Sequence, residues 1–86
     1  MMLHITSIYL EMRIVMQELK IREKDEFIKL GQAIKAAGLV ESGVEAKLVI
    51  QDGQVLVNGQ VETQRGKKLT GGEKVSYKGQ EILIIR

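Results

Sequence analysis

The spacing of apolar residues changes from a helical repeat to a strand repeat at Gln54. Upstream of it, apolar residues recur at helical intervals from residue 30, which predicts a helix with one buried face that ends at Gly38. The buried face carries Leu30, Ala33, Ile34 and Ala37, and Lys29, Gln32 and Lys35 point away from it. Downstream, apolar residues alternate in short runs between turn sequences. Helices followed by a small antiparallel sheet predict a single α+β domain.

A capping box marks the start of a second helix at Ser42. A serine followed by Glu45 in the third position lets each side chain accept a hydrogen bond from a backbone N–H at the helix start. The buried face of this helix carries Ala46, Val49 and Ile50. The helix is predicted to end at Gly53, and Lys47 lies on its flank, outside the buried face.

Turn sequences divide the rest of the chain into short strands. Asn58-Gly59 suits the positive φ angles of a type I′ turn, so the segments on either side are predicted to form a hairpin. Strands are expected at 17–22, 55–57, 60–61, 74–77 and 80–85, with turns at 23–25, 70–73 and 78–79. The segment 63–68 is predicted to be a basic connection.

Residues 1–15 precede the predicted domain, which covers 16–86. They are rich in apolar residues, but Glu11, Arg13 and the lack of a small-residue cleavage site argue against a signal peptide or a membrane span. Alternation from Ile8 to Met16 favours a strand, although helical spacing also fits. Two interpretations stay open: this N-terminal extension is a strand, or it is an artefact that precedes a natural start at Met12 or Met16.

The composition excludes several kinds of chemistry. Without cysteine, the 86-residue chain cannot form disulfides, zinc fingers or thiol nucleophiles, and this fits a reducing cytoplasm. The single histidine, His4, supports neither a metal cluster nor a catalytic dyad. The carboxylates are scattered rather than paired as acid–base catalysis requires. We therefore expect a protein that is not an enzyme, with no catalytic residue, metal, cofactor or small-molecule substrate.

Basic residues gather in one segment of the chain. Arg65, Lys67 and Lys68 fall within 63–69, which contains no acid, while the net charge of the whole chain is only +2. Lys29 opens the first predicted helix and Lys47 flanks the second. A run of charge is usually a solvated surface, but a mildly basic protein is also compatible with a polyanionic partner.

A family resemblance favours the second interpretation. The segments 27–33 and 42–59 resemble the RNA-binding domain first defined in small-subunit ribosomal protein S-four. The pattern is a serine, an alanine four residues later, and the run Ile50-Gln51-Asp52-Gly53-Gln54-Val55-Leu56-Val57-Asn58-Gly59. With residues 62–69 included, the chain looks most like the small stand-alone bacterial members, the YaaA/YbcJ-like proteins, over about residues 17–86.

The resemblance implies an αL-type fold, with two short helices packed on a small antiparallel sheet. It also implies a protein that binds structured RNA by shape and phosphate contacts. We expect a cytoplasmic protein whose partner is ribosomal RNA, a ribosomal particle or another structured RNA, and no membrane association. The candidate RNA-binding residues are Lys29, Lys35, Ser42, Gly43, Lys47, Arg65, Lys67 and Lys68. Relatives commonly have arginine after the serine, so Gly43 departs from the family pattern.

Two rival functions stand beside RNA binding. A protein-interaction module would use a sheet edge or the apolar N-terminal extension. A ubiquitin-like sulfur carrier would share the small α+β size but needs a Gly-Gly terminus, whereas this sequence ends in Ile84-Ile85-Arg86. The prediction is a non-enzymatic RNA-binding protein.

Overall fold

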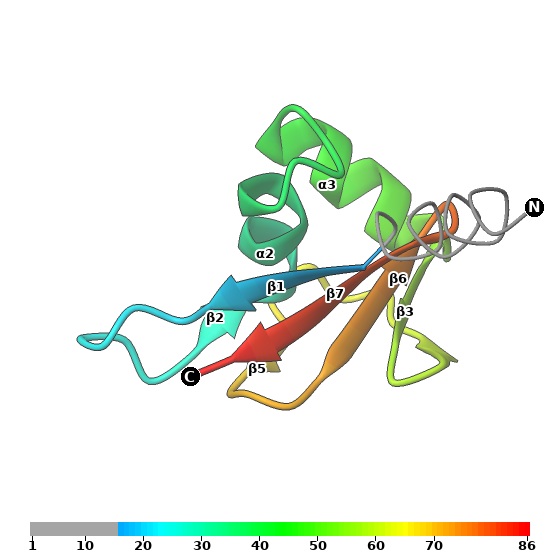
Figure 1. Ribbon diagram of the computed structural model, residues 1–86. Helices are drawn as coiled ribbons and strands as arrows, with labels where there is room; N and C mark the ends of the chain where they lie inside the picture. Colours follow the sequence, from blue (N-terminus) through cyan, green and yellow to red (C-terminus); the bar gives the residue numbers. More distant parts are fainter. Residues whose placement is uncertain (1–15) are drawn as a thin grey trace, which may run out of the picture.

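Two helices cover one face of a five-stranded sheet in the computed structural model, which describes residues 16–86 (Figure 1). The helices are α2 (Leu30–Ala36) and α3 (Gly43–Gln51). They begin and end close to where the apolar repeat, the Ser42 cap and the glycines predict. The interpretations of residues 1–15 as a strand or an artefact lie outside the described residues.

The strands form one large sheet and one small one. Their bounds are β1 (Met16–Lys20), β2 (Ile28–Lys29), β3 (Val55–Val57), β4 (Gln60–Val61), β5 (Lys68–Leu69), β6 (Lys74–Tyr77) and β7 (Gln80–Ile85). The large sheet has the order β1-β7-β6-β3-β4, and β2 pairs with β5 separately. The hairpins β3–β4 and β6–β7 confirm the strands and turns predicted from the alternating segments.

The sheet is mixed rather than wholly antiparallel, because β1 runs parallel to β7. Parallel neighbours need a long crossover connection. Here both helices and most of the sheet lie between the two strands in sequence, so that connection is available. The predicted antiparallel sheet is formed by β3, β4, β6 and β7. The alternating pattern gives no information on the direction in which β1 joins it.

The β2–β5 pair is the element that the sequence pattern missed. Ile28 lies opposite Leu69, and Lys29 lies opposite Lys68, so the end of the predicted basic connection is a strand. Two-residue strands are too short to show an alternating period. The pair joins the start of α2 to the segment that carries the basic residues.

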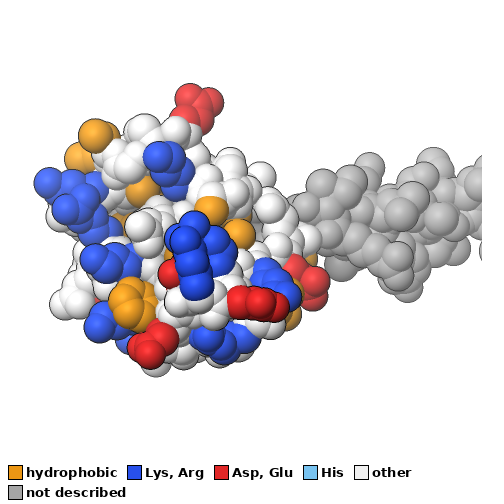
Figure 2. All heavy atoms as spheres, turned by 90° about the vertical axis from the view of Figure 1, so that its left-hand side faces the viewer, with side chains coloured by type: hydrophobic (Ala, Val, Ile, Leu, Met, Phe, Trp, Pro, Cys, Tyr) orange, Lys and Arg blue, Asp and Glu red, His pale blue; other side chains and the backbone are white. Residues whose placement is uncertain are grey.

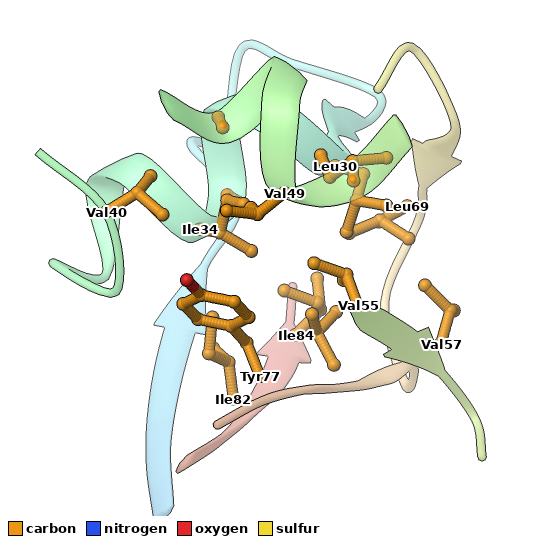
Figure 3. Close-up of a cluster of buried hydrophobic side chains, with 14 of the residues drawn as sticks. Leu30, Ile34, Val40, Val49, Val55, Val57, Leu69, Tyr77, Ile82 and Ile84 are labelled. Atoms are coloured by element: carbon orange, nitrogen blue, oxygen red, sulfur yellow. The ribbon is translucent and has the colours of Figure 1, made fainter. Parts of the chain in front are cut away.

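A single apolar core lies between the helices and the sheet (Figure 3). Its largest fully buried side chains are Leu30, Ile34, Ile50, Leu69, Ile82, Ile84, Val55 and Val75. Burial of a side chain of this size stabilises the folded state by about 1.5–3 kcal/mol. Because both helices contribute to this core, their exposed faces are held in fixed positions over the sheet.

The cap of α3 and the β3–β4 turn form as the sequence predicts, with one difference in the bond that Glu45 accepts. Ser42 Oγ accepts a hydrogen bond from Glu45 N–H at 3.0 Å, which confirms the predicted cap of α3. The Glu45 carboxylate accepts from the N–H of Glu41 at 2.7 Å, one residue before the position that a standard capping box uses. Asn58 and Gly59 have φ angles of +51° and +83°, as a type I′ turn requires.

Candidate nucleic-acid interface

The start of α2 is capped by the backbone of the basic segment rather than by a side chain. Lys29 occupies the N-cap position and makes no side-chain capping bond. Instead, Leu30 N–H donates to the Lys67 carbonyl at 2.8 Å, and Gly31 N–H donates to the Arg65 carbonyl at 2.9 Å. These bonds satisfy two of the N–H groups that a helix start leaves without partners. They also fix the Arg65 segment beside α2.

Gly31 lies where α2, α3 and the basic segment meet. A Cβ atom at this position would be 3.5 Å from both the Cβ and the carbonyl oxygen of Arg65, and 4.0 Å from the Cβ of Ala46. These are ordinary contact distances, so α2, α3 and the basic segment lie within one side-chain layer of each other at this position.

A pocket of about 560 Å³ opens at this junction. It is lined by Lys29, Gly31, Gln32, Lys35, Gly43, Ala46, Arg65 and Gly66. The pocket therefore brings together Lys29, Lys35, Gly43 and Arg65 from the predicted set, and its lining contains no acidic residue. Gln32, Ala46, Gly31 and Gly66 were not predicted, because nothing local in the sequence relates residue 31 to residue 65.

Basic side chains spread over the side of the molecule that lies at the left of Figure 1, as Figure 2 shows. All the predicted site residues are exposed. Gly43 and Gly66 would have nothing within 4 Å of an added Cβ, so this part of the pocket wall is open to solvent. Gly43 brings no charge to this pocket, and Arg65 supplies a guanidinium there.

Lys67 and Lys68 line a different pocket, of about 430 Å³, together with Glu62 and Glu73. Burial raises the pKa of Glu73, but hydrogen bonds from the N–H groups of Thr70 and Gly71 outweigh it and leave the pKa below its usual value. The carboxylate therefore stays charged beside the lysines.

Lys68 is also engaged by an aromatic side chain. Its Nζ lies 4.8 Å from the centroid of the Phe27 ring, within the range of a cation–π contact. The basic cluster that is continuous in sequence is thus divided in space, with Arg65 on one side and Lys67 and Lys68 on the other.

Ser42 caps the start of α3, and Lys47 lies within the helix. The Ser42 hydroxyl is occupied by the helix cap. Lys47 is exposed but lines neither of these pockets. It lies on the outward side of α3 with Val44 and Leu48, which are 69% and 60% exposed.

Residues 16–86 contain no group of three or more histidine, cysteine, aspartate or glutamate side chains that could hold a metal ion. In the same part of the chain, neither helix has the length and apolar character needed to cross a membrane.

Comparison with known proteins relates this arrangement to a family. The family model described as "S4 domain" matches residues 19–85. The "Putative RNA-binding protein YbcJ" of Escherichia coli (strain K12) is 37% identical over 62 residues, covering 72% of this chain and 89% of the relative. The "Probable ribosome maturation protein RlbA" of Bacillus subtilis (strain 168) is 41% identical over 54 residues, covering 63% of this chain and 76% of the relative.

A solved structure shares the fold. The solution structure of YbcJ from E. coli, described as revealing an αL motif involved in RNA binding, matches with a TM-score of 0.63 and 32% identity. The match covers 80% of this chain and 86% of that one. The predicted α+β, αL-type fold is confirmed.

Proposed function

Because the chain belongs to the S4 domain family, we propose that it is a non-enzymatic RNA-binding protein that recognises structured RNA through phosphate contacts. The observation that carries this proposal is the acid-free pocket lined by Lys29, Lys35 and Arg65. RNA phosphates are the polyanion that such a surface suits, since each contact also releases condensed counterions.

The three basic residues come from elements that the fold holds rigidly. Lys29 lies at the β2–α2 junction, Lys35 in α2, and Arg65 in the segment bonded to Gly31. Arginine can bind a phosphate through two parallel N–H groups, whereas lysine acts as a point charge. Fixed backbones reduce the ordering cost that binding would otherwise carry.

The aromatic residues support recognition of duplex or folded RNA rather than of unpaired bases. Among residues 16–86, Tyr77 is buried in the core and Phe27 is half-buried with Lys68 over its ring. Single-stranded nucleic acids are usually bound by exposed aromatic platforms, and double-stranded RNA by shape and backbone contacts. Phosphate contact without stacking therefore fits a structured partner.

We infer that the partner is ribosomal RNA or a ribosomal particle in the cytoplasm. This inference is supported by the name of the B. subtilis relative, "Probable ribosome maturation protein RlbA". Binding to purified ribosomal subunits in sucrose gradients tests it. Phosphate contacts are strongest at low salt, so a protein that does not sediment with the subunits at low salt would contradict the inference.

A protein-interaction function is the alternative, and the sheet edges offer one observation in its favour. Met16 in β1 and Val61 in β4, at opposite edges of the sheet, are 42% and 58% exposed. An edge strand presents unpaired backbone groups that a second chain can extend. If the protein has this function, substitution of the basic residues in the pocket should leave binding of the protein partner unchanged.

Titration of a fluorescent RNA hairpin at several salt concentrations tests RNA binding directly. The variant Lys35→Gln/Arg65→Gln should bind several-fold more weakly and flatten the salt slope by up to about two units, at about 0.7–0.9 per lost phosphate contact. The control Lys74→Gln/Lys78→Asn removes the same charge from β6 and the β6–β7 turn and should change neither quantity. Equal effects of the two variants would contradict the proposed site.

A further inference from the structure

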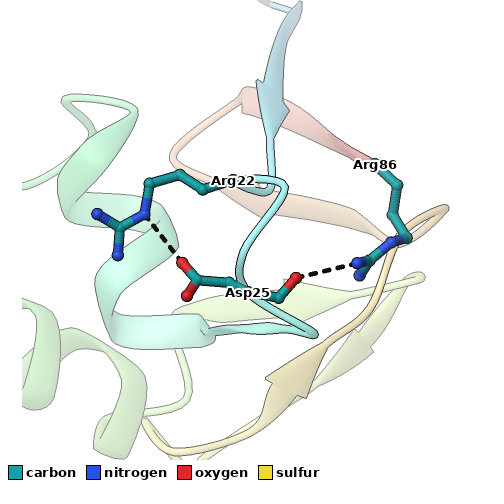
Figure 4. Close-up of polar contacts among 3 residues, drawn as sticks. All are labelled: Arg22, Asp25 and Arg86. Carbon is teal, nitrogen blue, oxygen red and sulfur yellow. Dashed lines mark hydrogen bonds and ion pairs between the residues drawn. The ribbon is translucent and has the colours of Figure 1, made fainter.

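The loop between β1 and β2 holds an arginine in a fixed orientation. Arg22 Nε donates a hydrogen bond to Asp25 Oδ2 at 2.9 Å, and Asp25 N–H donates to the Arg22 carbonyl at 2.9 Å (Figure 4). The two residues are therefore bonded through both their side chains and their backbones. An exposed arginine usually samples many rotamers, and this pair of bonds restricts that freedom.

A second arginine fixes the same loop from the strand side. Arg86 follows β7, and its Nη1 donates to the Glu26 carbonyl at 2.6 Å while its Nη2 donates to the Asp25 carbonyl at 2.9 Å. Figure 4 shows Asp25 between the two arginines, with its carboxylate toward Arg22 and its carbonyl toward Arg86. The loop backbone that positions Asp25 is thus attached to the sheet.

The Arg22 guanidinium keeps two nitrogens for an external partner. Within residues 16–86, the side-chain hydrogen bond of Arg22 is the one from Nε to Asp25. Its side chain is 72% exposed. The terminal amino groups, which can bind a phosphate through parallel bonds, are left to solvent.

Arg22 lies beside the pocket already described. It lines a recess of about 300 Å³ with Lys20, Asp25 and residues of α2 that include Gln32 and Ala36. Gln32 also lines the pocket of Lys29, Lys35 and Arg65. The two hollows therefore adjoin across α2, and the acidic group in the second one is the carboxylate already bonded to Arg22.

We propose that Arg22 is a further RNA-phosphate contact, oriented by Asp25, which extends the binding surface across α2 to the β1–β2 loop. This inference rests on the proposed function. Since the loop carries acids as well as bases, its contribution is a short-range contact rather than a general attraction. The partner must present phosphates on both sides of α2, as a folded or double-stranded RNA does and a mononucleotide does not.

The test compares variants of one exposed side chain in the RNA-hairpin titration. Arg22→Ala should weaken binding several-fold and lower the salt slope by about 0.7–0.9, the value for one phosphate contact. Arg22→Lys should keep the slope but bind more weakly than the wild type, because lysine cannot form the Asp25 bond through Nε or the parallel pair of bonds. Lys74→Gln, a charge-matched control on β6, should match the wild type.

The outcomes separate this inference from the proposed function. If Lys35→Gln/Arg65→Gln weakens binding but Arg22→Ala leaves affinity and slope unchanged, the Arg22 contact is wrong and the proposed function stands. If Lys74→Gln weakens binding as much as Arg22→Ala, the effect is one of total charge and the contact is again wrong. If the wild-type protein does not bind the hairpin at low salt, both are overturned.

Discussion

Two hydrogen bonds join Asn58, in the β3–β4 turn, to Lys74 at the start of β6. The Asn58 N–H donates to the Lys74 carbonyl at 2.8 Å, and Asn58 Oδ1 accepts from the Lys74 N–H at 3.0 Å. Asn58 therefore does more than form the β3–β4 turn, because its side chain also satisfies a backbone donor at the start of β6. Asn58 therefore has a structural role in holding the β3–β4 hairpin against β6.

This pairing predicts different costs for two substitutions. Asn58→Gly keeps the positive φ angle but loses the side-chain bond, so stability should fall by about 1 kcal/mol. Asn58→Ala loses the bond and also places a Cβ in the left-handed region, which adds about 1 kcal/mol or more. Urea unfolding of the two variants measures both losses of stability. Equal stability of Asn58→Ala and Asn58→Gly would contradict the expected cost of a Cβ in the left-handed region.

The α3 cap predicts that Ser42→Ala lowers stability by about 1 kcal/mol, because the Glu45 N–H loses its acceptor. Ser42→Asp supplies another acceptor and should stay close to the wild type. Denaturant midpoints measure the difference. An unchanged midpoint for Ser42→Ala would mean that this hydroxyl contributes nothing to the helix start.

Glu62 should oppose RNA binding, because it lines the same pocket as Lys67 and Lys68. Glu62→Gln keeps an acceptor for the Gln64 N–H and removes the negative charge. We expect tighter binding of the RNA hairpin at low salt, with the difference lost at high salt through screening. Weaker or unchanged binding at low salt would place this pocket outside the interface.

Glu73 predicts a dependence of stability on pH. Its pKa in the folded protein lies below the ordinary value of 4.5, so the folded state prefers the carboxylate. The resulting stabilisation is present above the unfolded pKa and is lost as the pH falls through the folded pKa. Thermal unfolding between pH 6 and about pH 3 should show a smaller fall in Tm for Glu73→Gln than for the wild type. An equal fall in Tm for the two proteins would contradict the lowered pKa of Glu73 in the folded state.

Residues 1–15 are predicted to be dispensable for folding and for RNA binding. The buried apolar residues of the described chain all lie between Ile21 and Ile84. A protein that begins at Met16 should therefore unfold cooperatively and bind the RNA hairpin as the full chain does. Loss of cooperative unfolding would instead support the interpretation of the extension as a strand that completes the sheet.

Local sequence patterns predicted the elements well and their assembly less well. The repeat of Leu30 and Ile34, the Ser42 cap and the Asn58-Gly59 turn are decided by neighbours in sequence, so each could be read directly. The direction of β1 and the β2–β5 pair depend on contacts between distant segments. Neither leaves a periodic signal.

The same reason limits the prediction of the site. Lys29, Lys35, Gly43 and Arg65 line one pocket because Gly31 N–H bonds to the Arg65 carbonyl, and that contact is invisible in the sequence. Lys67 and Lys68 follow Arg65 closely along the chain but line another pocket beside Glu73. Arg22 shows no distinguishing signal, because its loop mixes acids and bases. Closeness in sequence was a poor guide to closeness in space.

The parallel pairing of β1 with β7 has a consequence for the order of folding. Met16 lies opposite Glu81, so β1 has no partner in the sheet until nearly the whole domain has been synthesised. Closing so long a loop carries an entropic cost that the local hairpins β3–β4 and β6–β7 avoid. Pairings between distant segments slow folding. The helix pair and the antiparallel strands can therefore assemble first, and β1 then joins the sheet edge that β7 leaves open.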